Sequence, residues 1–323
     1  ARSASGAVLI ATANGGAEGT SGSIRLATGD ALSRPSGSVS LATGASTASR
    51  AGDMVISPGT SGSGAAADLD MIAGTTTDPA YPDVGATSIS SGYSPNGASG
   101  DLLLQTANAG ARGVSGDIVV KTGTSSAGNT GAVSVTTSES AYGAGGAISL
   151  TVGQGTGPRG GGIVIDAGDA RAPASSGGSV VLHGGAGSSA DVLDGGDGGE
   201  VRVSGGAAHG GAPGDVGGAL LLHGGLGSSS SGGEVLVSSG IGRGSTSGRV
   251  LLATANAGEG GASGSLGLAT GTSSLGATGS INVRTGDARG SAGGSVTFNV
   301  GAGNSGSGGA ITVLAGGTTG ATA

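Results

Sequence analysis

The chain has 323 residues, of which 78 are Gly and 10% are charged, and its formal net charge at pH 7 is −7. With one Phe, three Tyr and no Trp, it lacks the large side chains that fill an ordinary globular core. The acidic balance argues against a nucleic-acid partner, the absence of Cys removes disulfides and thiolate metal sites, and the apolar runs are far shorter than the roughly 18 residues of a membrane span.

In chain order, the sequence divides into twenty tandem units of mostly 15 or 16 residues, each marked by one anchor residue. Six residues before the anchor, 19 of the 20 units carry Gly, and Gly directly follows the anchor in 16 units. Four and two residues before the anchor the side chains are apolar, with Thr87 as the exception. The anchors are Thr12, Thr28, Thr43, Pro58, Ala73, Ser91, Thr106, Thr122, Thr137, Val152, Ala167, Gly184, Gly205, Gly224, Ser239, Thr254, Thr270, Thr285, Val300 and Ala315.

Alternation of apolar and variable residues before each anchor predicts a short strand with its apolar pair on one face. A period of about 15 residues suits one coil of a β-solenoid. We therefore expect an all-β fold, a parallel β-solenoid (β-helix) of about twenty 15–16-residue coils with glycine-rich return segments. A coil of about thirty residues with two facing sheets is the alternative.

A longer repeat lies over the first. The cassettes 12–73, 106–167 and 254–315 have the same distances between successive anchors, whereas 176–233 is a looser insert. We expect one continuous solenoid domain over 1–323. Because the chain begins at Ala1 without Met, we also expect it to be a section of a longer protein.

Few residues suggest site chemistry. The Ser residues have no His and Asp partners in a plausible triad, so we expect neither catalysis nor a cofactor. Asp191, Asp194, Asp197 and Glu200 lie in the longest loop, where glycines separate oxygen ligands that can wrap Ca²⁺. A solvated loop is the alternative, since calcium β-rolls repeat such a motif coil after coil and here it occurs once.

Two features indicate partners. The outward position three before the anchor is apolar in many units, and such a stripe is costly in a monomer, which predicts self-association or contact with other filament subunits. Tyr81 and Tyr93 are aromatic side chains that can stack on a carbohydrate, the alternative being that they cover the defect at Thr87. The predicted interface residues are Leu9, Val164, Val181, Leu221, Leu236 and Leu251.

The phrase Ser-Gly-x-aliphatic-x-aliphatic-x-Thr-Gly occurs at 21–29 and 36–44, and Thr-Gly-Thr-Ser-Ser at 270–274. In these phrases the chain resembles very long Gly/Ser/Thr/Ala-rich repeat proteins predicted in algae and related microbial eukaryotes, which are regarded as surface or extracellular proteins. More loosely, it is similar to the β-helical stalks of adhesins and filament subunits. The resemblance implies an extracellular or cell-surface location and assigns no functional residue.

Repetition, composition and the apolar stripe together predict a structural protein, a rigid rod-like subunit of an extracellular filament, surface appendage or wall coat. The alternative is an adhesive β-solenoid module that binds carbohydrate or ice. Ice binding requires a regular outward array of Thr, whereas the cassette Thr residues align with the inward apolar pair.

Overall fold

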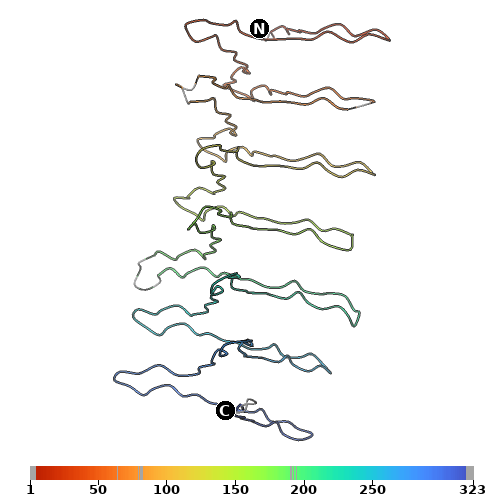
Figure 1. Cartoon of the computed structure of the whole chain (residues 1–323). Helices are drawn as coiled ribbons and strands as arrows, with labels where there is room; N and C mark the ends of the chain where they lie inside the picture. The colour runs from red at the N-terminus through yellow and green to blue at the C-terminus, as the bar shows by residue number, and fades with distance from the viewer. Residues whose placement is uncertain are drawn as a thin grey trace. The chain divides into compact units, whose positions relative to one another are not determined.

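The computed structural model describes residues 5–63, 65–78, 80, 83–189, 191, 193 and 195–317. None of these residues lies in a helix or a strand, and the backbone consists of loops, tight turns and irregular connections (Figure 1). This part of the chain accordingly contains no helix of the length and apolarity that a bilayer requires. It divides into two units, Ala1–Thr151 and Val152–Ala323, and the same local loop pattern recurs in each.

The predicted all-β solenoid is therefore wrong, and so is the alternative with two facing sheets. A solenoid core requires the apolar pairs of successive coils to stack, but no apolar side chain of the described residues is buried. The accessible surface is 31645 Å², whereas a folded monomer of 29.0 kDa exposes about 11,400 Å². Burial of a hydrophobic core thus contributes nothing to the order that these residues show.

The recurring structure is instead a loop that closes on itself. Each loop runs from an anchor to the residue six before the next anchor. This residue is Gly in every loop except the one that ends at Ala67, and we call it the closing glycine. Figure 1 shows many of these loops with their two arms side by side. In seven loops the closing glycine N–H donates to the C=O of the Gly that follows the anchor, over N to O distances of 2.8–3.0 Å. These pairs are Gly85 to Gly74, Gly100 to Gly92, Gly178 to Gly168, Gly199 to Gly185, Gly218 to Gly206, Gly233 to Gly225 and Gly248 to Gly240.

The size of the anchor side chain decides which loops carry this hydrogen bond. All seven loops follow an anchor of Ala, Ser or Gly, and none of the described loops that follow Thr, Val or Pro carries it. At most Thr and Val anchors the side chain lies against the closing glycine, as Thr28 does with its Cγ2 3.4 Å from the position a Cβ on Gly37 would take. A β-branched anchor therefore holds the two backbone arms apart, whereas a small anchor lets them approach to hydrogen-bonding distance.

This contact also accounts for part of the glycine register. A side chain at the closing position would occupy space beside the preceding anchor, and at Gly161 a Cβ would come within 2.7 Å of Val152 Cγ1. Gly131 is less restricted, because its Cβ would make an ordinary 3.8 Å contact with Thr122 Cγ2. The glycine-rich return segments expected of solenoid coils are therefore not the reason for these glycines.

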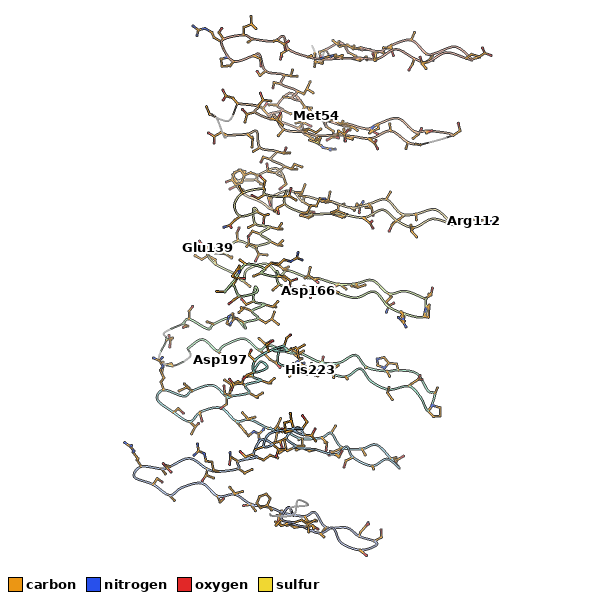
Figure 2. The ribbon with its side chains drawn as sticks, viewed as in Figure 1. Met54, Arg112, Glu139, Asp166, Asp197 and His223 are labelled. Atoms are coloured by element: carbon orange, nitrogen blue, oxygen red, sulfur yellow. The ribbon has the colours of Figure 1, made fainter. Side chains whose placement is uncertain are left out.

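Tight turns form the tips of several loops. The first loops of the three cassettes share one turn, in which Gly19 donates to Gly16, Gly113 to Gly110 and Gly261 to Gly258 over 3.0–3.2 Å. Arg112 lies at the tip of its loop (Figure 2). These hydrogen bonds span three residues, so the order in the loops is local in sequence.

The turn at 172–175 contains the sole described non-glycine residue in the left-handed region, Ala174 with a φ of 56°. Ser175 N–H donates to the Ala172 carbonyl at 3.2 Å across it. We expect Ala174→Gly to stabilise this turn by up to about 1 kcal/mol, because relief of about 1–2 kcal/mol of steric strain is partly offset by the larger chain entropy of Gly.

Amide hydrogen exchange at Ser175 measures this effect, and protection should rise by up to about fivefold. Ala172→Gly is the control, because Ala172 has no positive φ. Glycine there relieves no strain and only raises the conformational entropy of the open chain. Equal protection in the parent and in Ala174→Gly would contradict the expectation.

Candidate functional site

The apolar side chains of the repeat gather between the loops in short stretches that we call apolar segments, each running from five residues to one residue before an anchor. In nine units the three central side chains are all apolar, and every one of them is at least half exposed. These triplets are 8–10, 54–56, 102–104, 118–120, 163–165, 180–182, 220–222, 235–237 and 250–252.

The six predicted interface residues are all exposed, from 62% at Val181 to 89% at Leu9. The residues predicted to point inward are exposed as well, since Ile163 beside Val164 is 55% exposed. An apolar segment therefore offers both of its faces, and not only the predicted outward one, to contact.

The backbone of the apolar segments is also without partners. Within the described part of the chain, no backbone hydrogen bond involves a residue of any apolar segment, because all of them close loops or loop tips. Unpaired N–H and C=O groups next to aliphatic side chains are the features by which an edge strand recruits another strand. The segments can thus supply both apolar surface and backbone hydrogen bonds to a partner.

Charged residues lie in or beside several apolar segments. Arg50 forms an exposed ion pair with Asp53 at 2.6 Å, and Arg202 forms one with Glu200 at 3.1 Å, each worth at most about 1 kcal/mol. Asp117 begins the segment 117–121 and Lys121 ends it, and the described residues provide neither with an ion-pair partner. This pair was absent from the predicted site residues, although an acid and a base at the two ends of an aliphatic run are visible in the sequence.

The predicted calcium loop is only partly described, because Asp194 lies outside the described residues. Asp191 Oδ1 accepts a hydrogen bond from Leu193 N–H at 2.8 Å, and the Glu200 carboxylate is engaged by Arg202. Asp197, another of the predicted calcium ligands, lies in the same stretch of the sequence (Figure 2). Among the described residues no three His, Asp or Glu side chains gather closely enough to hold a metal ion, so calcium binding stays a prediction.

The carbohydrate alternative likewise stays a prediction. Tyr81 lies outside the described residues, and the Tyr93 ring is exposed. A hollow of about 420 Å³ is lined by Asn282, Val283 and Arg284 alone. Ligand sites are formed by groups that converge from different parts of a fold, and three consecutive residues provide no such convergence.

No protein-family model matches this chain, and neither a curated protein nor a solved structure is significantly similar to it. The repeated exposed apolar segments, described above, are therefore the feature of this chain from which its function has to be inferred.

Proposed function

We propose that this chain is a structural protein, a subunit of an extracellular filament, surface appendage or wall coat, and that it associates with other subunits through its apolar segments. The observation that carries the proposal is the exposure of complete apolar triplets at the same position in nine units. The rigid rod of the sequence interpretation depended on solenoid coils, so rigidity is no part of the proposal.

Energetics favour association of these segments. Covering one exposed Val, Leu or Ile side chain stabilises the covered state by roughly 1.5–3 kcal/mol. Soluble monomers rarely expose contiguous apolar patches larger than a few hundred Å². Nine triplets in one chain also make association multivalent, because each contact formed raises the effective concentration of the remaining segments.

The subunit role and the extracellular location have separate support. Tandem units and repeated cassettes suit a protein that makes the same contact many times along its length. The location rests on the resemblance of the phrases at 21–29 and 36–44 to Gly/Ser/Thr/Ala-rich surface proteins.

Electron microscopy and light scattering of the purified full chain test the proposal. With rising protein concentration, we expect the mean mass to exceed the 29.0 kDa of one chain and fibres or laterally associated particles to become visible. Uniform 29.0 kDa monomers up to millimolar concentration would contradict it.

A further inference from the structure

We propose that the apolar segment 117–121 pairs with the same segment of a second copy of this chain, as two antiparallel strands centred on Val119. This inference rests on the proposed function, because it specifies one contact within the self-association. The partner is a second copy because the two ends of this segment are complementary in charge to each other.

The register follows from the order Asp117-Ile118-Val119-Val120-Lys121. Antiparallel pairing centred on Val119 places Asp117 of each copy opposite Lys121 of the other, and Ile118 opposite Val120. Opposite charges directly across a strand pair are favourable, and the two-fold axis forms the contact between Asp117 and Lys121 twice. Parallel in-register pairing would instead place Asp117 against Asp117 and Lys121 against Lys121, which is unfavourable.

No other apolar segment can replace this one. Asp101 begins the segment 101–105 but Gln105 ends it, and Arg249 begins 249–253 but Ala253 ends it. Segment 117–121 alone has an acid at its first position and a base at its last. Pairing with itself therefore satisfies four charges, whereas pairing with any other segment leaves at least one of its charges without an opposite charge.

The groups that this pairing needs are accessible. Val119 and Val120 are 72% and 70% exposed, and no backbone hydrogen bond joins the segment to any other described residue. Because side chains alternate along a strand, Val119 and the Asp117 and Lys121 pairs share one face, and Ile118 and Val120 share the other. Such a short strand pair is marginal alone, so we infer that it forms together with contacts of the other apolar segments.

Lys121 is the only lysine of the chain, which permits a specific test. A carbodiimide couples a lysine amine to a carboxylate with loss of water and leaves no spacer, so it links only groups in direct contact. In an assembled one-to-one mixture of ¹⁵N-labelled and unlabelled full-length protein, we expect Lys121 of one isotopic form joined to Asp117 of the other. Linkage only within one isotopic form, or only to another acid, would overturn the register.

Charge reversal provides the second test. Asp117→Lys and Lys121→Asp each place like charges opposite one another twice, and we expect each to raise the association midpoint concentration about tenfold and to abolish the cross-link. The double variant, with Asp117→Lys and Lys121→Asp together, should restore both the association midpoint of the parent and the cross-link between positions 117 and 121. Glu139→Lys changes the net charge as Asp117→Lys does but lies in a loop, and should leave the cross-link intact.

The outcomes separate this inference from the proposed function. A parent that associates, with Asp117→Lys weakening association no more than Glu139→Lys, would overturn the pairing and leave the proposed function standing. Failure of the double variant to restore the cross-link would also overturn it. If the variant with Asp117→Asn and Lys121→Gln associated more tightly than the parent, the two charges would only keep the segment solvated. This result would overturn the pairing as well. A parent that stays monomeric would overturn both proposals.

Discussion

Leu221→Asp is expected to raise the concentration at which the protein associates by at least tenfold while leaving the isolated chain unchanged. Leu221 is the central residue of the triplet 220–222 and is 73% exposed, so a carboxylate there remains hydrated in the monomer. In an associated state it loses roughly 1.5–3 kcal/mol of apolar burial, equivalent to a factor of about 10 to 150, and adds the cost of desolvating a charge.

Ser229→Asp is the matched control, because it adds the same charge in the adjacent loop, outside any apolar segment. Light scattering over a dilution series gives the midpoint for both variants. Equal midpoints for Leu221→Asp and Ser229→Asp would show that the triplet 220–222 takes no part in association.

The same reasoning applies to Leu268, which belongs to an apolar pair that the solenoid interpretation placed on the inner face. In a solenoid, Leu268→Asp would place an unpaired carboxylate in the core at a cost of several kcal/mol. Leu268 is 68% exposed, so we expect no effect on the isolated chain. If the isolated Leu268→Asp chain showed a large loss of amide hydrogen-exchange protection, the apolar segment that contains Leu268 would have to be covered within the molecule.

Ala167→Thr is expected to remove the hydrogen bond from Gly178 N–H to the Gly168 carbonyl. Small anchors carry this bond and β-branched anchors do not, since the extra methyl separates the two arms of the loop. A backbone hydrogen bond contributes about 1 kcal/mol net, so hydrogen-exchange protection of Gly178 should fall about fivefold. Ala167→Ser is the control and should retain protection, because loops that follow Ser91 and Ser239 close normally.

The reciprocal change is Thr122→Ala. It removes the side chain that borders Gly131, and we expect a new hydrogen bond from Gly131 N–H to the Gly123 carbonyl. Gly131 protection should then rise to that of Gly178. Unchanged exchange in both Ala167→Thr and Thr122→Ala would mean that anchor size is unrelated to loop closure.

The periodicity of the residues was sufficient to identify the repeat. The spacing of anchors, glycines and aliphatic pairs shows which residues are equivalent, and the structure places equivalent residues in equivalent loops, as with Gly16, Gly110 and Gly258. The exposed interface residues, such as Leu221 and Leu236, were also selected from this pattern. Equivalent loops require only that each unit have the same residue types at the same positions, and these are visible in the sequence of the unit itself.

Whether successive units touch could not be read from the same pattern. Alternating aliphatic residues suit a strand stacked on the next coil and equally an unpartnered segment, because period-2 spacing specifies two faces and not what covers them. Among the described residues the structure closes seven loops on themselves, through glycines such as Gly206 and Gly218, and hydrogen-bonds no coil to the next. A short glycine-rich loop can close locally at a small entropic cost, and this closure leaves the aliphatic residues of the described chain exposed for a partner.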